Sequence, residues 1–98
     1  MKDIRQELCD LSGDDDLLFA DGFDDCIIGV ALAGPGMEQR VVYDAEACVQ
    51  ELMNSGIDDI DDADEFFSIN TLGSYVGPRT PIYITRYEPR TTTQEGEA

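Results

Sequence analysis

The stretch that decides the fold runs from Tyr43 to Ile84 and contains three consecutive patterns. It begins Y-D-A-E-A-C-V-Q-E-L-M (43–53), continues D-D-I-D-D-A-D-E-F-F-S-I-N (58–70) and ends L-G-S-Y-V-G-P-R-T-P-I-Y-I (72–84). In the first pattern apolar side chains recur at i, i+3, i+4 and i+7, and in the second they recur at i, i+3 and i+4, the period of a helix with one buried side. In the third, glycines and prolines precede a short β-branched and aromatic run. The stretch therefore predicts two helices, a loop and a strand.

Acidic residues mark the start of each predicted helix. Asp44 is expected to cap a helix near 45–53, because its carboxylate can accept hydrogen bonds from the unpaired N–H groups of the first turn. Asp62 and Glu65 have the spacing of a capping box for a helix near 63–70. The apolar stripe of the first helix, expected to face a sheet, is Ala45, Cys48, Val49 and Leu52. In the second helix the same spacing is occupied by Ala63, Phe66 and Phe67, with the polar Asn70 at i+7.

Two further strands and a helix are predicted upstream. Cys26–Leu32 and Arg40–Tyr43 flank a glycine-rich loop and are expected to form a β-hairpin. Cys26–Leu32 has apolar or small residues on both sides, which is typical of a central strand covered on both faces. Residues 2–11 have the spacing of a short amphipathic helix, and Gly13 is expected to follow its end.

These elements together predict the α+β class. The expected arrangement is a small antiparallel sheet of about three strands, with the two central helices packed on one face and a short N-terminal helix added. Residues 1–87 are expected to form a single compact domain. Residues 88–98 contain no large apolar side chain and are expected to be a disordered polar tail.

The charge is unusual in both amount and distribution. Among 98 residues there are 22 acids and 6 bases, a formal net charge of −16. Residues 1–65 hold 19 acids and 3 bases, so they carry the whole excess of −16, whereas residues 66–98 hold 3 of each. Such a surface repels nucleic acid and anionic membranes and attracts basic proteins. Neither a bilayer-spanning apolar run nor a secretory signal is evident in the sequence.

The sequence offers little for catalysis or metal binding. It contains no histidine, and its three cysteines are widely spaced, so a structural zinc site is excluded and free thiols are expected. An EF-hand loop starting at Asp59 fails, because its fifth and sixth positions are Ala63 and Asp64. We therefore expect no enzyme and no cofactor, with a weak divalent-cation site in the acidic run as a minor alternative.

Two sets of residues are candidates for partner binding. The first is the acidic run near the second predicted helix, expected to form one face with Asp14–Asp16, Asp24 and Asp25. The second is the loop with Tyr75 and Arg79, where a structural role is the simpler interpretation and partner binding is the alternative. Pairing of Arg79 with an acid of the second helix is a further option. The candidate residues are Asp58, Asp59, Asp61, Asp62, Asp64, Glu65, Tyr75 and Arg79.

The patterns quoted above resemble a group of small proteins encoded by tailed bacteriophages. In that group a Y-D-x-x-x helix precedes an E-x-F-x-x-N segment and a Y-V-G-x-x-T-P strand entry, here V-V-Y-D-A-E-A-C-V-Q-E-L-M, A-D-E-F-F-S-I-N and L-G-S-Y-V-G-P-R-T-P-I-Y-I. The resemblance covers residues 17–84, and the aspartate-rich run at 58–62 departs from it. It implies a phage product in the cytoplasm of an infected bacterial cell. The group has no assigned function, so no site residue is carried over.

Charge and resemblance together favour a small acidic phage accessory protein that acts as a non-enzymatic binding module. A rigid acidic face can imitate nucleic acid and inhibit a basic host protein, as anti-defence proteins do. The alternative is that the acidity is solvation in a saline habitat, which five arginines against one lysine also suit. The protein would then be a virion or assembly component, or another interaction protein.

Overall fold

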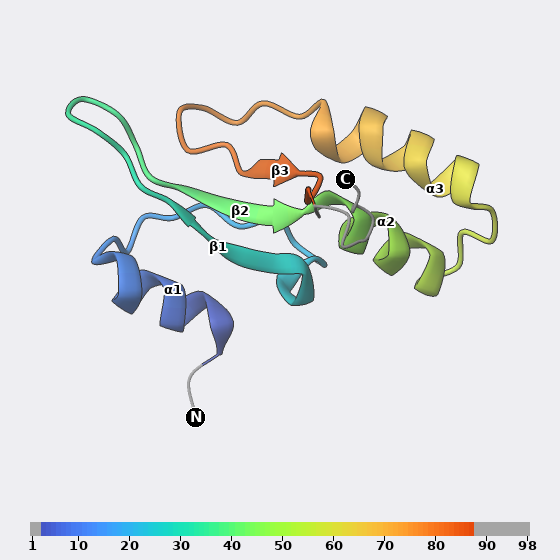
Figure 1. Cartoon of the computed structure of the whole chain (residues 1–98), viewed down its shortest axis with the longest axis horizontal. Coiled ribbons are helices and arrows are strands. Elements are labelled where there is room, and N and C mark those ends of the chain that lie inside the picture. The colour runs from blue at the N-terminus through green and yellow to red at the C-terminus, as the bar shows by residue number, and fades with distance from the viewer. Residues whose placement is uncertain (1–2, 88–98) are drawn as a thin grey trace, which may run out of the picture.

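The computed structural model describes residues 3–87 and has the predicted α+β class (Figure 1). Its elements are helix α1 (Ile4–Ser12), the 3-10 turn η1 (Asp24–Cys26), strands β1 (Ile27–Ala31) and β2 (Arg40–Asp44), helices α2 (Ala45–Asn54) and α3 (Ile60–Phe67), the π-helical turn η2 (Ser68–Leu72) and strand β3 (Ile82–Ile84). The predicted N-terminal helix is confirmed. The tail predicted for 88–98 lies outside the described residues.

The sheet is mixed, with the strand order β1-β2-β3. β1 and β2 form the predicted antiparallel hairpin, but β3 runs parallel to β2, with Val42 opposite Ile82 and Asp44 opposite Ile84. The expectation of a purely antiparallel sheet was therefore wrong. The reason is the connection between β2 and β3. Residues 45–81 carry the chain through α2, α3 and a loop back to the end of the sheet where β2 begins, and parallel strands need such a long crossover.

The central strand is β2, not the segment Cys26–Leu32 that the sequence favoured. β3 joins the side of β2 that the hairpin leaves open, so β1 becomes an edge strand. Val41 and Tyr43 of β2 are completely buried, whereas Ile28 of β1 is exposed at a break in the β1–β2 register. Apolar residues on both sides of the segment Cys26–Leu32 therefore did not mean that other elements cover both faces of the strand.

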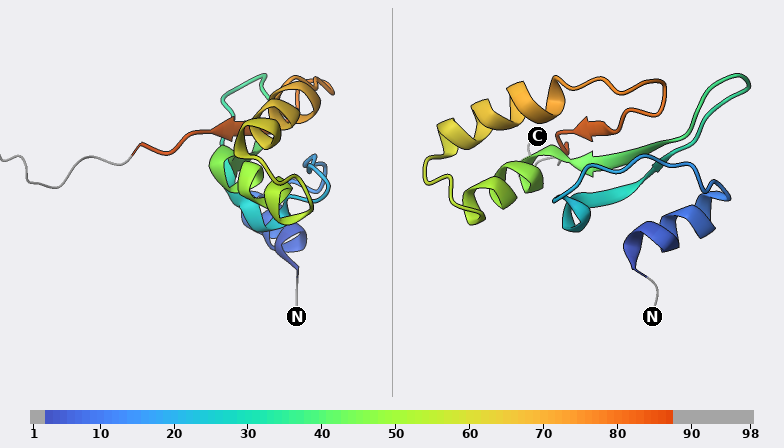
Figure 2. Two further views of the ribbon diagram at one scale, coloured as in Figure 1. Left: turned by 90° about the vertical axis from the view of Figure 1, so that its right-hand side faces the viewer. Right: turned by 180° about the vertical axis from the view of Figure 1, so that it is seen from behind.

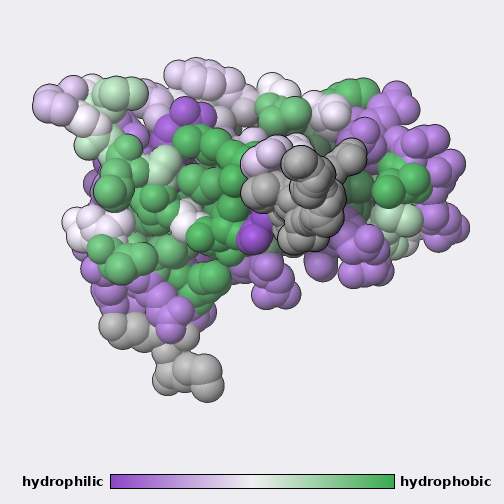
Figure 3. Space-filling model, viewed as in Figure 1, coloured by the Kyte–Doolittle hydropathy of each residue, from purple (hydrophilic) through white to green (hydrophobic). Residues whose placement is uncertain are grey.

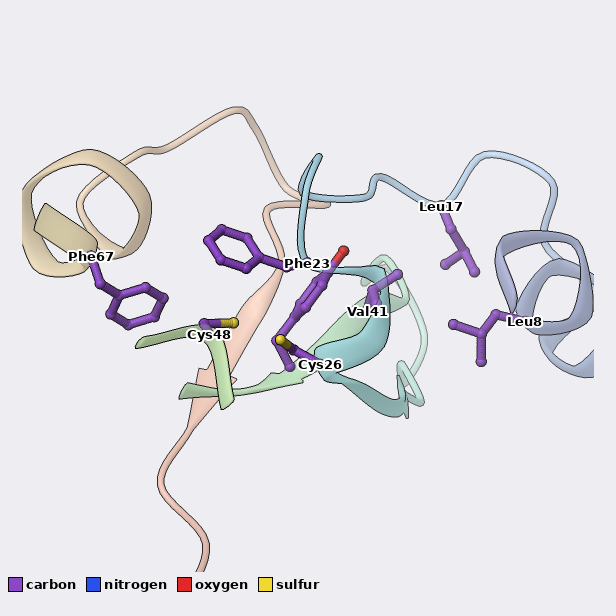
Figure 4. Close-up of a cluster of buried hydrophobic side chains, with 8 residues drawn as sticks. Leu8, Leu17, Phe23, Cys26, Val41, Cys48 and Phe67 are labelled. Atoms are coloured by element: carbon purple, nitrogen blue, oxygen red, sulfur yellow. The ribbon is translucent and has the colours of Figure 1, made fainter. Parts of the chain in front are cut away.

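One core joins all parts of the described chain (Figure 4). Leu8 and Leu17 meet at the α1 side, and Cys48 and Phe67 come from α2 and α3. Phe23 projects from the segment before η1, and its ring meets that of Phe67. Seen from behind, the segment leading into Phe23 crosses over the sheet (Figure 2). The Ala20 N–H donates to the Tyr43 hydroxyl, with 2.7 Å between nitrogen and oxygen, which fixes this segment on β2.

Stacked aromatic rings attach β3 and α3 to the core. The ring of Tyr83 stacks on that of Tyr43 with 5.3 Å between centroids, and the Phe67 ring meets Tyr83 edge-on at the same separation. Such pairs are worth roughly 0.5–1.5 kcal/mol beyond their buried area. They join the two ends of the crossover, which explains how a strand of three residues is held in the sheet.

The helices differ from prediction in which residues they bury. Cys48 is the fully buried residue of α2, and Val49 and Leu52, expected in the buried stripe, are half-buried. In α3 Phe67 is 3% exposed and Phe66 is 45% exposed. The helices lean on one another and extend beyond the carboxyl end of β2 (Figure 1), so each buries a narrower stripe than a helix lying flat on a sheet.

The start of α3 also differs from prediction. Asp59 is the N-cap: its backbone is extended, and its carboxylate accepts from the Asp61 N–H at 3.0 Å. Asp62 and Glu65, expected to form a capping box, lie inside the helix. The helix begins before the predicted cap because Asp59 satisfies the first-turn N–H groups earlier. The caps of α1 and α2 are Asp3 and Asp44, the latter as predicted.

Candidate functional site at the start of α3

The six acids of the predicted site gather at the start of α3, at the end of the molecule opposite α1 (Figure 1). All six are exposed. Asp59 caps the helix, and Asp61 and Asp62 lie in its first turn, where the positive end of the helix dipole favours negative charge. The residues are Asp58, Asp59, Asp61, Asp62, Asp64 and Glu65.

The arginines of the described chain are engaged elsewhere. Three of them form ion pairs, and the Arg40 guanidinium donates to the Thr80 carbonyl. The pairs are Arg5 with Asp21 and Asp24, Arg79 with Asp14 and Glu38, and Arg86 with Asp44. Within residues 3–87, therefore, no basic side chain pairs with the six acids at the start of α3.

Arg79 pairs with different acids from those expected. The sequence suggested an acid of the second helix, but Arg79 lies 2.8 Å from the Asp14 carboxylate and 2.6 Å from that of Glu38. The hydrogen bond to Arg79 lowers the pKa of Asp14 below its usual value. Tyr75, from the same loop, is 77% exposed. Arg79 thus fastens the loop to the chain after α1, and Tyr75 projects from it.

The structure divides the acidic face that the sequence predicted. Asp14–Asp16 follow α1 and lie at the far side of the sheet from α3 (Figure 1). Asp24 and Asp25 belong to η1, and Arg5 holds Asp24 at 3.0 Å. The prediction of one continuous face was therefore wrong. Sequence separation does not show where these segments lie in the fold, and an arginine neutralises part of the acids at η1. The acids at the start of α3 form a separate surface.

A groove between α2 and α3 adjoins these acids. It has a volume of about 540 Å³. Its lining residues are Ala45, Glu46, Val49, Gln50, Ile60, Asp61, Asp64, Phe67 and Thr85. Sequence reasoning missed the groove and most of these residues. The spacing of Ile60, Asp64 and Phe67, at i, i+4 and i+7, was the available signal that they share one side of α3.

The chemistry of the described chain offers little beyond charge. Within residues 3–87 no three acids or cysteines are grouped so that they could hold a metal ion. Burial raises the pKa of the Cys26 and Cys48 thiols. Both thiols are therefore protonated near neutral pH and are weak nucleophiles. Cys9 shows the same direction of pKa shift, caused first by desolvation and then by nearby aspartates.

The surface separates into polar and apolar parts. Hydrophilic residues gather at the α3 end, and hydrophobic residues cover much of the front of the sheet (Figure 3). None of the helices found in residues 3–87 has the length and apolar character needed to cross a bilayer. Comparison of the chain with protein-family models, curated proteins and solved structures finds no match. The resemblance to phage proteins therefore stays a prediction.

Proposed function

We propose that this protein is a non-enzymatic binding module whose acidic surface at the start of α3 binds a basic surface of another protein. One observation carries the proposal. Arginines hold acids of the α1 side and of the sheet, but within residues 3–87 none holds the six acids of α3. Their charge is directed outward and is available to a partner.

Electrostatics favours a partner at this surface. Asp61 and Asp64, Asp61 and Glu65, and Asp62 and Glu65 lie three or four residues apart within α3, and like charges at these spacings destabilise a helix. A lysine or arginine of a partner close to one of these carboxylates adds Coulomb attraction, which grows as the contact excludes water. Basic side chains of a partner would relieve the repulsion and add this attraction.

The density of charge supports imitation of nucleic acid over a short length. The chain makes two extended steps from Asp58 to Ile60 and five helical steps from Ile60 to Glu65. The six carboxylates therefore lie along about 14 Å, or about one per 2.4 Å. A duplex carries about one charge per 1.7 Å of axis. The acidic surface therefore corresponds to about four base-pair steps, at 3.4 Å each. A small basic groove fits this length. The phage resemblance suggests that the partner is a basic protein of the bacterial host, which this protein would inhibit as anti-defence proteins do.

The test compares two variants that change the net charge equally. The site variant replaces four α3 acids by asparagine and spares Asp59, whose loss would remove the helix cap. The control variant replaces four exposed acids of the α1 side and η1. The substitutions are D58N, D61N, D62N and D64N for the site, and E7Q, D15N, D16N and D25N for the control.

Pull-down from a bacterial lysate with the parent protein, read by mass spectrometry, identifies the partner. The site variant should then associate more slowly with that partner and show a weaker dependence on salt, because complementary charges steer encounter. The control variant should bind like the parent, and duplex DNA should compete with all three. Circular dichroism confirms that both variants fold. If the site variant binds as tightly as the parent at low salt, the proposal is wrong and solvation explains the acidity.

A further inference from the structure

The groove between α2 and α3 has an apolar interior. Phe67, 3% exposed, and half-buried Val49 form its deeper part. Ile60 lines the same groove and is 59% exposed. A single exposed isoleucine is ordinary on a protein surface. Here, however, it borders a cavity whose interior is already apolar, so an entering apolar side chain would cover it and contact Val49 and Phe67 together.

Both walls of the groove carry negative charge. Glu46 comes from α2, and Asp61 and Asp64 come from α3. No lysine or arginine lines the groove within residues 3–87. An apolar side chain flanked by bases therefore matches the groove, since the bases meet carboxylates on either side. Its volume of about 540 Å³ lies within the usual range of ligand pockets, roughly 300–1,000 Å³.

We propose that this groove receives the apolar side chains of a basic amphipathic segment of a partner protein, with Val49, Ile60 and Phe67 as the apolar contacts. This inference rests on the proposed function and names the class of partner. Helices bind in grooves through apolar residues at i, i+3, i+4 and i+7, which leave their remaining sides free for charges. Recognition then depends on the pattern of apolar and basic residues and not on positive charge alone.

The experiment uses the full chain and two synthetic peptides made of leucine and lysine. In the patterned peptide the leucines recur at i, i+3, i+4 and i+7, and the scrambled peptide has the same composition without this period. Fluorescence anisotropy at physiological salt measures both affinities. The parent protein should bind the patterned peptide about tenfold more tightly than the scrambled one, as expected when an interface gains a central apolar contact.

Two isoleucines of the α3–η2 segment supply a matched pair of variants. Ile60→Ser changes the groove, whereas Ile69→Ser changes an isoleucine that is 64% exposed and lies outside it. Ile60→Ser should lose about tenfold in affinity for the patterned peptide and should no longer distinguish the two peptides. Ile69→Ser should behave like the parent. Amide shifts in NMR spectra of the parent should move at Val49 and Thr85 when the patterned peptide is added.

The outcomes separate this inference from the proposed function. If both peptides bind the parent equally and Ile60→Ser has no effect, while the D58N, D61N, D62N and D64N variant loses affinity, the groove proposal is overturned and the acidic surface stands. If that four-residue variant also binds like the parent, both proposals fail. Loss of affinity in Ile69→Ser equal to that in Ile60→Ser would place the contact outside the groove and would also overturn the inference.

Discussion

At the scale of single residues, neighbouring aspartates of α3 have different roles although they have the same chemistry. Asp59 has extended backbone and accepts the Asp61 N–H, which satisfies one of the unpaired donors of the first turn. Asp62 lies three residues later, inside the first turn, where its own backbone is already helical and no longer in the extended conformation of a cap. The position of a carboxylate relative to the first turn, not its identity, decides whether it caps.

This difference predicts unequal effects of two alanine substitutions. Asp59→Ala should lower the free energy of unfolding by about 1 kcal/mol, the usual cost of losing an N-cap. Asp62→Ala should change it by less than about 0.5 kcal/mol, as surface substitutions usually do. Urea titrations followed by circular dichroism measure both. Equal losses would contradict the assignment, and a larger loss in Asp62→Ala would restore the capping box expected from the sequence.

At the scale of elements, α3 contributes both to the core and to the binding surface. Its buried side ends in Phe67, whose ring meets Phe23 with 6.5 Å between centroids and Tyr83 with 5.3 Å. Its exposed side carries the acids. The core contacts hold the helix in place, so the acids and the groove are presented on a rigid support, which lowers the entropy cost of binding.

Adjacent phenylalanines of α3 provide the test of this division. Phe67→Ala should cost roughly 3–5 kcal/mol of stability, because it leaves a cavity among buried rings. Phe66 is 45% exposed. Phe66→Ala should therefore cost less than about 1 kcal/mol. Thermal and urea melts should give the same order, and a loss for Phe66→Ala as large as that for Phe67→Ala would mean that α3 buries a different side.

At the scale of the whole molecule, an ion pair between Arg79 and Asp14 joins segments that are 65 positions apart. It connects the loop before β3 to the chain after α1, and the loop in turn meets the hairpin through Glu38. Arg79, one of the few basic residues, thus holds together segments that are distant in the sequence. That use of Arg79 is part of the reason why the opposite end keeps its negative charge.

The same pair predicts a dependence of stability on acid. Hydrogen bonding to Arg79 holds the pKa of Asp14 below its usual value, so the folded state binds this proton more weakly than the unfolded chain does. Its stabilising effect is present above the ordinary pKa of about 3.9 and is lost as the pH falls through the lowered value. Asp14→Asn should be less stable than the parent at pH 7 and lose less stability below about pH 4.

Urea titrations at a series of pH values measure this difference. Asp16→Asn, which removes an exposed carboxylate two residues away, serves as the control and should keep the acid profile of the parent. An Asp14→Asn profile parallel to that of the parent at every pH would show that the Arg79 pair does not couple folding to protonation.

Much of the local structure could be predicted because it depends on interactions within a few residues. The apolar period of 45–53 indicated α2, Asp44 was correctly identified as its cap, and Gly13 follows the end of α1 in the left-handed conformation that suits glycine. The exposure of the six acids between positions 58 and 65 also followed from sequence, because charged side chains are almost never fully buried unless they are paired. These features need no knowledge of distant segments.

Only the tertiary structure decided which distant groups meet. The crossover of residues 45–81 made β3 parallel and β2 central, although each strand had been located from its own pattern. The partners of Arg79 and Arg5 depend on where the loop and α1 come to lie, so the predicted acidic face was divided. The groove exists only because α2 and α3 pack side by side. The periodicity and caps of single elements do not predict these contacts, because the packing of the whole chain determines which distant segments meet.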